Sequence, residues 1–164
     1  MNSSEIEILL VEDNPTDVEL TLHALRYNCV VNRIHVAGDG EEALDFIFCR
    51  GLHATRSPQE LPKLILLDLR LPKVDGIEVL HAIKSHEMTR LIPVVALTSC
   101  GEEADLVKSY QLGVNSYIQK PVDFVQFRET VRHLGLFWMV VNEPSPAPAP
   151  GQISDNGIRH VDSK

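Results

Sequence analysis

The chain has 164 residues, of which 44% are hydrophobic and 23% charged, a balance typical of a globular protein with one buried core. Its formal net charge is −8 and its basic residues form no cluster, which argues against direct binding of nucleic acid. No apolar run approaches the roughly 20 residues of a membrane-spanning helix, so the composition also argues against insertion into a membrane.

The N-terminal sequence MNSSEIEILLVEDN has no basic region and no small-residue cleavage site, so it predicts a first strand rather than an export signal. We therefore expect a cytoplasmic location. The cysteines, Cys29, Cys49 and Cys100, are odd in number and form no CxxC pair, which is typical of reduced thiols.

Short apolar runs alternate with amphipathic segments along the chain. Five strand and helix pairs are predicted, in chain order: Ile6–Val11 and Pro15–Tyr27; Arg33–Val36 and Glu41–Cys49; Leu64–Leu67 and Ile77–Ser85; Pro93–Leu97 and Glu102–Leu112; Ser116–Gln119 and Asp123–Trp138. Runs such as ILLV, LILL and PVVAL are apolar at nearly every position, as strands of a parallel sheet covered on both faces are. The fold class is therefore α/β, a doubly wound five-stranded parallel sheet with helices on both faces.

Local signals support several boundaries. Asn14 before Pro15 is a plausible N-cap with Pro at the first helical position, and Asp75 can open the helix after the third strand. The sequence RGLHATRSPQELPK makes an unusually long connection between the second helix and the third strand. We expect one domain over residues 1–142 and a flexible Pro-rich tail, EPSPAPAPG and beyond, over residues 143–164.

Polar residues stand at the end of each of these strands except the second. In an open parallel sheet, ligands bind beyond the carboxyl ends of the strands, near the point where the strand order reverses. With the flavodoxin-like order 2-1-3-4-5, strands 1 and 3 are neighbours. The residues expected to converge are Glu12 and Asp13, Asp68, Thr98, and Lys120.

Three carboxylates in one pocket repel one another, because two like charges about 4 Å apart cost roughly 4 kcal/mol at an effective dielectric of 20. Protonation of one acid or a bound cation relieves this repulsion, and Mg²⁺ suits a set of oxygen ligands. Lys120 would bring an ammonium to the pocket, with the Pro121 bond in the cis form aiming it inward, and Thr98 would add a hydroxyl. Asp68 could then attack a phosphoryl group.

Plainer explanations exist for each residue alone. An Asp after an apolar strand is often a turn or capping residue, EDNP could be only a helix cap, and a Lys-Pro pair carries little information. The joint pattern, with all five residues at strand ends in one order, outweighs these explanations.

The motifs LLVEDNP, LILLDLRLPKVDG, VVALTS and YIQKP resemble those of the receiver domain of bacterial two-component response regulators, from Ile6 to about Leu136. The resemblance implies a phosphoacceptor signalling protein that catalyses only its own phosphorylation and dephosphorylation. The implied roles are as follows: Asp68 receives a phosphoryl group from a sensor histidine kinase; Glu12, Asp13 and Asp68 bind Mg²⁺ with the backbone carbonyl of Arg70; and Thr98 and Lys120 contact the phosphoryl oxygens.

The resemblance also implies a switch, in which phosphorylation draws Thr98 inward and an aromatic residue on strand 5, Tyr117, follows. A half-exposed strand tyrosine is the alternative interpretation of Tyr117. We further hypothesise that Arg70 and Cys100, each two residues beyond a site residue, regulate the access of water to the acyl phosphate.

The long connection and the aromatic pair Phe137 and Trp138 resemble single-domain regulators that partner bacterial phytochromes. That resemblance implies a homodimer through helix 4, strand 5 and helix 5, although Phe137 and Trp138 could instead cover the protein's own core. The sequence does not reveal the cognate kinase or whether a histidine phosphotransfer protein receives the phosphoryl group.

Three other functions compete with this interpretation, and the sequence argues against the first two. A phosphatase of the haloacid dehalogenase type would need a second Asp where Arg70 stands. A flavodoxin-like electron carrier would need a phosphate-binding loop where the chain has the acidic EDNP. An adaptor with the receiver fold that works without phosphorylation is the third.

Overall fold

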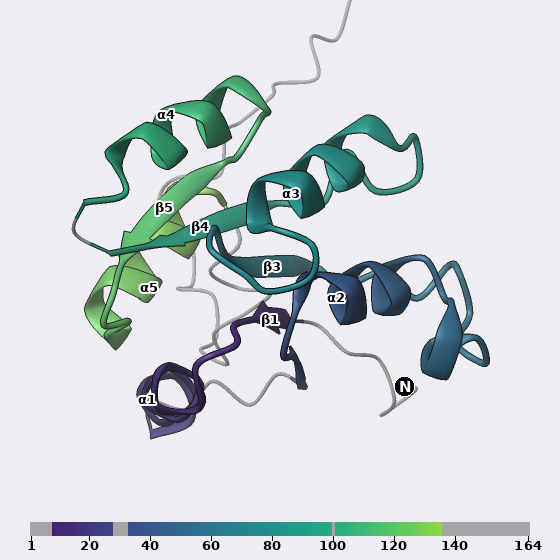
Figure 1. The fold of residues 1–164 in the computed structure, drawn as a ribbon. Helices are drawn as coiled ribbons and strands as arrows, with labels where there is room; N and C mark the ends of the chain where they lie inside the picture. The colour runs from purple at the N-terminus through teal and green to yellow at the C-terminus, as the bar shows by residue number, and fades with distance from the viewer. Residues whose placement is uncertain (1–7, 28–32, 100, 136–164) are drawn as a thin grey trace, which may run out of the picture.

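The computed structural model describes residues 8–27, 33–99 and 101–135 as a single parallel sheet between helices (Figure 1). The strands are β1 Ile8–Val11, β2 Ile34–Ala37, β3 Leu64–Asp68, β4 Val94–Thr98 and β5 Ser116–Gln119. The helices are α1 Pro15–Tyr27, α2 Gly40–Ile47, α3 Gly76–Ser85, α4 Glu103–Gln111 and α5 Phe124–His133, with a short 3₁₀ helix, η1, at Gly51–His53. The sheet order is β2-β1-β3-β4-β5 and every neighbouring pair is parallel, which confirms the predicted fold class and strand order.

The two faces of the sheet are covered by different helices (Figure 1). Along β1, Leu9 and Val11 pack under α2 and α3, whereas Ile8 and Leu10 pack under α1 and α5. Every residue of β1, β3 and β4 is buried. The continuous apolar runs in the sequence therefore reflect strands covered on both sides.

The start of α1 follows the predicted capping chemistry. The side-chain oxygen of Asn14 accepts hydrogen bonds from the backbone N–H groups of Thr16, at 2.9 Å, and Asp17, at 3.2 Å. Pro15 takes the first helical position, where no N–H is needed. This cap fixes where α1 begins, directly after the acidic residues that follow β1.

The start of α3 differs from the prediction in one respect. Asp75 occupies the N-cap position, but its carboxylate makes no hydrogen bond to the helix and instead accepts one from the Leu71 N–H at 3.4 Å. The next residue, Gly76, lies against the end of β3, and a β carbon there would come within 2.2 Å of the Asp68 carbonyl oxygen. Glycine therefore allows α3 to begin beside Asp68.

Two helices end earlier than predicted. Helix α5 ends at His133, with Leu134 as C-cap and Gly135 at φ 73°, so the predicted extension to Trp138 is wrong at its first residues. A residue with positive φ satisfies the last helical carbonyls and stops the helix, and glycine adopts it without strain. Helix α2 similarly ends at Ile47, before Cys49 at φ 54°.

Several predictions lie outside the described residues. They concern Cys29, Cys100, Phe137, Trp138 and the tail at 143–164. Within the part of the chain that the structure describes, no helix has both the length and the apolar character needed to cross a membrane.

Candidate functional site

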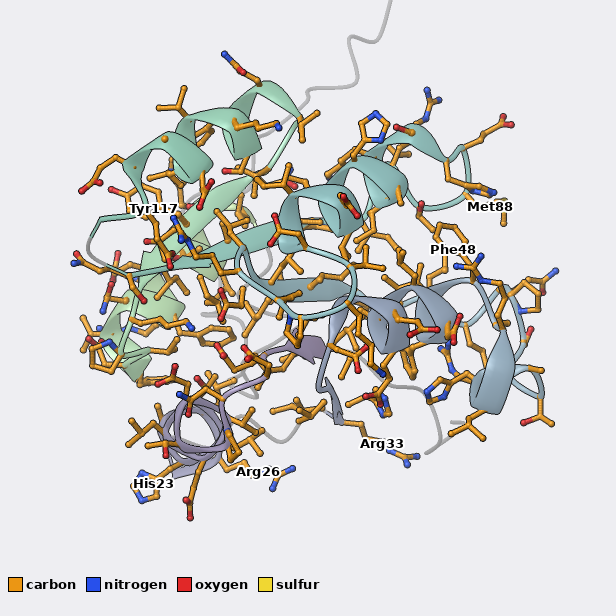
Figure 2. All side chains as sticks on the ribbon, viewed as in Figure 1. His23, Arg26, Arg33, Phe48, Met88 and Tyr117 are labelled. Carbon is orange, nitrogen blue, oxygen red and sulfur yellow. The ribbon has the colours of Figure 1, made fainter. Side chains whose placement is uncertain are left out.

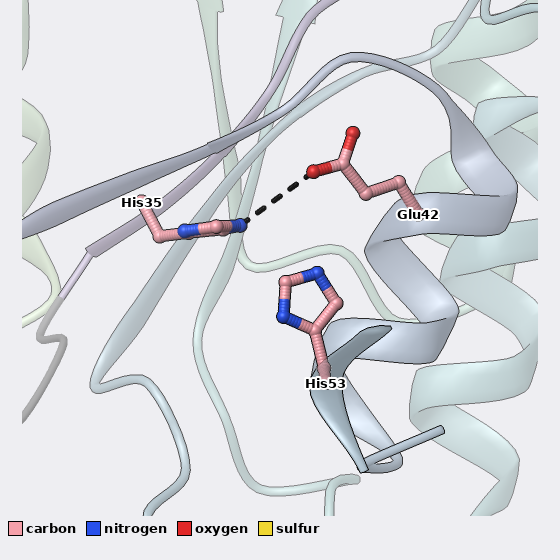
Figure 3. A group of neighbouring side chains, drawn as sticks. All are labelled: His35, Glu42 and His53. Carbon is pink, nitrogen blue, oxygen red and sulfur yellow. Dashed lines mark ion pairs between the residues drawn. The ribbon is translucent and has the colours of Figure 1, made fainter. Parts of the chain in front are cut away.

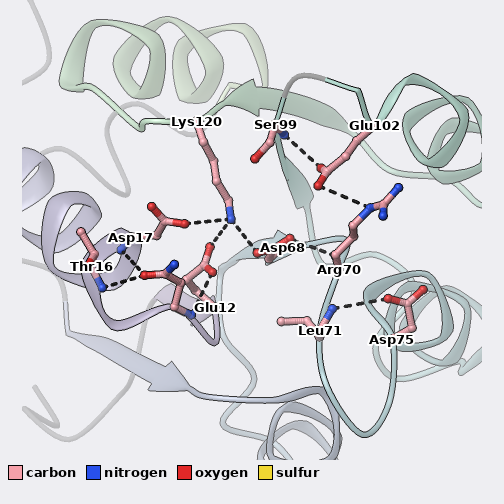
Figure 4. Close-up of polar contacts among 11 residues, drawn as sticks. Glu12, Thr16, Asp17, Asp68, Arg70, Leu71, Asp75, Ser99, Glu102 and Lys120 are labelled. Atoms are coloured by element: carbon pink, nitrogen blue, oxygen red, sulfur yellow. Dashed lines mark hydrogen bonds and ion pairs between the residues drawn. The ribbon is translucent and has the colours of Figure 1, made fainter.

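The polar residues at the strand ends gather at one edge of the sheet (Figure 4). Glu12 and Asp13 directly follow β1, Asp68 is the last residue of β3, and Lys120 directly follows β5. Glu12 is 2% exposed and Asp68 is 4% exposed, whereas Asp13 is exposed at the rim. The structure thus brings together in one pocket the acids and the lysine that the sequence singled out.

The ammonium of Lys120 is at the centre of this pocket (Figure 4). Its Nζ lies 2.6 Å from Asp68 Oδ2, 2.7 Å from Glu12 Oε2 and 3.3 Å from Asp17 Oδ2. One cation therefore contacts three carboxylates, and the charges of the buried pair Glu12 and Asp68 are only partly compensated.

The remaining carboxylate oxygens have unequal surroundings. Asp68 Oδ1 accepts a hydrogen bond from the Arg70 N–H at 2.9 Å, and Glu12 Oε1 accepts one from the Asn14 N–H at 3.2 Å. Glu12 Oε2 touches the ammonium as an ion pair without hydrogen-bond geometry, so this buried oxygen has no hydrogen-bond partner among the described residues. An oxygen in this state is available to a proton or to a metal ion.

The electrostatics of the pocket move two pKa values. Burial, together with the neighbouring carboxylate of Asp68, raises the pKa of Glu12 to about 7, although Lys120 opposes this change. Burial also acts to lower the pKa of Lys120, but the hydrogen bonds to Asp68 and the contact with Glu12 outweigh it, and the net pKa is raised. Lys120 is therefore charged at neutral pH, while Glu12 exchanges its proton near neutrality.

The acidic residues fit a hard divalent cation. Glu12, Asp13 and Asp68 can each offer one carboxylate oxygen, and these oxygens lie within 4.8 Å of one another. A set of oxygen donors at this spacing suits Mg²⁺ or Mn²⁺, which bind through a few carboxylates and keep several waters. Glu12 Oε2, which contacts Lys120 without hydrogen-bond geometry, can serve as a ligand once Glu12 has lost the proton that its raised pKa retains.

The side chain of Arg70 points away from Asp68 and toward α4 (Figure 4). Its Nε lies 3.0 Å from Asp105 Oδ2 and 3.5 Å from Glu102 Oε1, although the side chain is 63% exposed. Glu102 in turn accepts a hydrogen bond from the Ser99 N–H at 3.0 Å. Arg70 therefore connects the loop after β3 with the loop after β4, above the pocket.

The other two predicted site residues lie on β4 and β5. Thr98 is buried at the end of β4, and its carbonyl oxygen accepts a hydrogen bond from the Lys120 N–H at 2.7 Å. The Lys120–Pro121 bond is cis, as the sequence predicted. Tyr117 is 47% exposed and lies beside α4, where its ring meets that of Tyr110 edge-on with a centroid distance of 6.4 Å (Figure 2).

The sequence interpretation missed three carboxylates that the fold adds to this region. Asp17 reaches Lys120, and Glu102 and Asp105 pair with Arg70. The position of Asp17 in the first turn of α1, a few residues after the end of β1, is a signal that could have revealed it, because this turn begins beside the strand ends. Sequence spacing could not reveal the partners of Arg70.

The amino-acid sequence of this chain is similar to those of many known proteins. The family model "Response regulator receiver domain" matches residues 8–132. The probable methanogenesis regulatory protein FilR2 of Methanothrix harundinacea is 44% identical over 142 residues, which cover 87% of this chain and 88% of that protein. Response regulator Rcp1 of Synechocystis is 39% identical over 132 residues, covering 80% of this chain and 88% of Rcp1.

Solved structures give the same result. The bacteriophytochrome response regulator AtBRR is 52% identical with a TM-score of 0.76, and the match covers 85% of this chain and 99% of that one. The Mn²⁺-bound form of Rcp1 superposes with a TM-score of 0.66 at 36% identity, covering 85% of this chain and 98% of that one.

Proposed function

Because the chain belongs to the family of response regulator receiver domains, we propose that it accepts a phosphoryl group from a sensor histidine kinase on the carboxylate of Asp68. The observation that carries this proposal is the contact of Asp68 with the Lys120 ammonium at 2.6 Å inside an acidic pocket. The carboxylate is held on a buried strand, so its position varies little.

The arrangement supports an in-line transfer. A carboxylate oxygen of Asp68 attacks phosphorus, the bond from phosphorus to the imidazole nitrogen of the kinase breaks, and the departing histidine keeps the bonding electron pair. The Lys120 ammonium, which pairs with Asp68 before the reaction, can move to the phosphoryl oxygens as their charge increases. The Thr98 hydroxyl, at the end of the adjacent strand, is our second proposed contact for these oxygens.

We assign Mg²⁺ to the oxygens of Glu12, Asp13 and Asp68, with the backbone carbonyl of Arg70 as a further ligand. When bound, the ion would offset the charge of the carboxylates and of the phosphoryl group. Glu12 must lose its proton to serve as a ligand, and its pKa of about 7 places that loss near neutral pH.

The switch follows from the same geometry. A phosphoryl group adds about −1.5 to −2 charges, which can draw Lys120 away from Glu12 and attract the hydroxyl of Thr98. Tyr117 is the second residue of β5, the strand neighbouring β4, and its ring lies against α4, so a change at Thr98 has a short path to the surface of α4 and β5. We propose this surface, with α5, as the output face and as the dimer interface.

The identity of the kinase is a finer proposal. AtBRR, a bacteriophytochrome response regulator, is 52% identical to this chain in a match that covers 99% of AtBRR. On this basis we propose a bacterial phytochrome as the phosphodonor. Onward transfer to a histidine phosphotransfer protein is consistent with a reversible acyl phosphate.

The decisive experiment compares the wild type with Asp68→Asn after incubation with acetyl phosphate and Mg²⁺. Intact-mass measurement should show the addition of one phosphoryl group to the wild type and none to the variant. Glu78→Gln, an equivalent acid-to-amide change at an exposed position of α3, is the matched control and should be phosphorylated like the wild type.

The same experiment separates the proposal from its alternatives. No gain of a phosphoryl group in either the wild type or Asp68→Asn would favour an adaptor that works without phosphorylation. A phosphatase of the haloacid dehalogenase type is disfavoured, because Arg70 stands where a second acid is required and its guanidinium pairs with α4.

A further inference from the structure

We propose that His35, Glu42 and His53 form a second metal site, selective for a borderline divalent ion such as Zn²⁺, on the β2 and α2 side of the molecule. One ligand atom from each residue lies within 4.8 Å of the others, and the three side chains point toward a common centre (Figure 3). His35 comes from β2, Glu42 from the first turn of α2, and His53 from η1. None of them belongs to the acidic pocket.

The first argument is the state of His35. Its ring stacks on Phe46 with a centroid distance of 4.2 Å and an interplanar angle of 10°, so its orientation is fixed by packing. Nε2 is buried and has no hydrogen-bond partner among the described residues. The Glu42 carboxylate lies 3.7 Å from it, too far for a hydrogen bond. A buried ring nitrogen directed at a carboxylate and a second imidazole lacks the partner that a metal ion would supply.

The second argument is geometric. Three atoms at the corners of an equilateral triangle with 4.8 Å sides lie about 2.8 Å from its centre. Zinc requires about 2.0–2.2 Å to imidazole nitrogen and carboxylate oxygen. Each side chain therefore has to move by less than about 1 Å, which rotation about side-chain bonds provides without a change of fold.

The third argument is that the ligand Glu42 is held from behind by two hydrogen bonds. Glu42 Oε2 accepts a hydrogen bond from the Gly38 N–H at 2.9 Å, so Oε1 is the oxygen directed at His35. The Glu42 N–H donates to the Asp39 carboxylate at 2.7 Å, which anchors the first turn of α2. Supporting contacts of this kind orient metal ligands and raise affinity.

His53 is placed by the connection that follows α2. Arg56 donates hydrogen bonds to the carbonyl oxygens of Phe46 and, at 2.7 Å, of Glu60, and its guanidinium lies 3.6 Å from the centre of the Phe46 ring. The His53 ring meets the rings of Phe46 and His35 edge-on, at centroid distances of 5.2 Å and 5.3 Å. The connection is thereby folded back onto α2 with His53 against His35.

The acidic surroundings favour a bound cation, and they leave one of its coordination positions open to water. A pocket of about 300 Å³ adjoins His53 and Glu42, and its other charged lining residues are Asp39, Glu41, Asp45 and Lys73. Four carboxylates thus face one ammonium, which itself pairs with Asp39 at 3.2 Å. Water from this pocket can complete a tetrahedral set of two nitrogens and one oxygen. Mg²⁺, which prefers oxygen ligands, is a poor match for this set.

The test is calorimetric titration of Zn²⁺ into the full chain in millimolar Mg²⁺, which occupies the acidic pocket. The wild type should bind one Zn²⁺ at this site, and His53→Gln and Glu42→Gln should each weaken that binding by at least about tenfold. His81→Gln, an exposed histidine on α3, is the matched control and should bind like the wild type. Thermal unfolding without metal establishes that each variant is folded.

A spectroscopic measurement identifies the ligands. Co²⁺ in place of Zn²⁺ should give visible absorption bands of a low-coordinate nitrogen and oxygen site in the wild type, reduced in His53→Gln. Equal Zn²⁺ affinity in the wild type, His53→Gln and Glu42→Gln would overturn the proposal, as would cobalt bands with thiolate charge-transfer character. Neither result bears on the phosphorylation of Asp68, which the mass experiment tests separately.

Discussion

The acidic pocket around Lys120 and the group of His35, Glu42 and His53, here called the histidine cluster, both consist of ionisable side chains. Their charges and polar atoms are compensated in different ways. At the carboxyl ends of β1 and β3, Glu12 and Asp68 share the ammonium of Lys120 at 2.6–2.7 Å. Beside the edge strand β2, His35 and Glu42 are 3.7 Å apart, and the buried Nε2 has no hydrogen-bond partner in the described part of the chain.

This difference concerns what compensates the ligand atoms of each site before an ion binds. The acidic pocket contains its own cation, so its carboxylates are partly compensated without metal, and in our proposal Lys120 moves to the phosphoryl oxygens when that charge arrives. The histidine cluster offers two imidazoles and one carboxylate, and the buried Nε2 of His35 has no hydrogen-bond partner among the described residues, so an added metal ion would supply that partner directly. The predictions that follow are designed to disturb one cluster while leaving the other unchanged.

The largest effect is expected from Lys120→Met. Removing one partner of a buried ion pair leaves Glu12 and Asp68 without compensation, and such changes typically cost about 3–5 kcal/mol. Urea unfolding without metal should show this loss in the free energy of unfolding, and Mg²⁺ should restore more stability to the variant than to the wild type. Lys108→Met, an exposed lysine on α4, is the control. Equal stabilities of Lys120→Met and wild type would contradict the role of Lys120 as internal cation.

The second prediction concerns pH and Glu12. Burial and Asp68 raise the pKa of Glu12 from 4.5 to about 7 in the folded state. Between these values the folded protein holds a proton that the unfolded chain has lost, so the free energy of unfolding falls as pH rises. The contribution is at most about 3–4 kcal/mol, since one pKa unit corresponds to about 1.4 kcal/mol.

Glu12→Gln provides the measurement, because glutamine resembles the protonated acid and does not titrate. Without metal, the decrease in stability between about pH 4.5 and pH 7 should be smaller in Glu12→Gln than in the wild type. Identical pH profiles would show that another group causes the decrease.

The third prediction concerns the support of the histidine cluster. Asp39→Ala removes the N-cap of α2 and should lower the free energy of unfolding by about 1 kcal/mol. Because this cap also holds the turn that carries Glu42, the variant should bind Zn²⁺ more weakly. Asp123→Ala removes the equivalent cap of α5, where the carboxylate accepts a hydrogen bond from Gln126 at 2.9 Å. It should lose similar stability and keep the Zn²⁺ affinity of the wild type.

The smallest effect is expected from Arg70→Ala. The guanidinium connects the loop after β3 with Glu102 and Asp105, and its loss should change access of water to phosphorylated Asp68. We expect a severalfold change in the decay rate of the radiolabelled phosphoprotein, without loss of phosphorylation. Arg90→Ala, an exposed arginine before β4, is the control. An unchanged decay rate in Arg70→Ala would reject a gating role for this side chain.

Much of the fold was predictable because its signals are local. The runs before Glu12, Asp68 and Thr98 are apolar throughout, and the predicted bounds of α1 and β5 agree with the structure. The shared edge of parallel strands then places their terminal residues together, so Glu12, Asp68 and Lys120 could be predicted from strand ends alone, whereas Asp17 of α1 could not. Their contacts could not, since the sequence gives no distance between Lys120 and its three carboxylates.

The least predictable parts depend on long-range contacts. The prediction extended α5 beyond His133, because apolar periodicity continues past Gly135 and does not report backbone conformation. The connection after α2 showed no regular pattern, yet its placement depends on Arg56 reaching Phe46 and Glu60. No spacing rule relates a strand histidine to one in such a connection.

The sequence alone determined the alternation of strands and helices and the chemical identity of the groups at the strand ends, because both follow from neighbouring residues and from the repeat of each element. Only the tertiary structure decided that His35, Glu42 and His53 share one centre, and that Arg70 turns toward α4. The physical reason is that side-chain partners across an irregular connection are fixed by packing and charge in three dimensions, where separation along the chain carries no information.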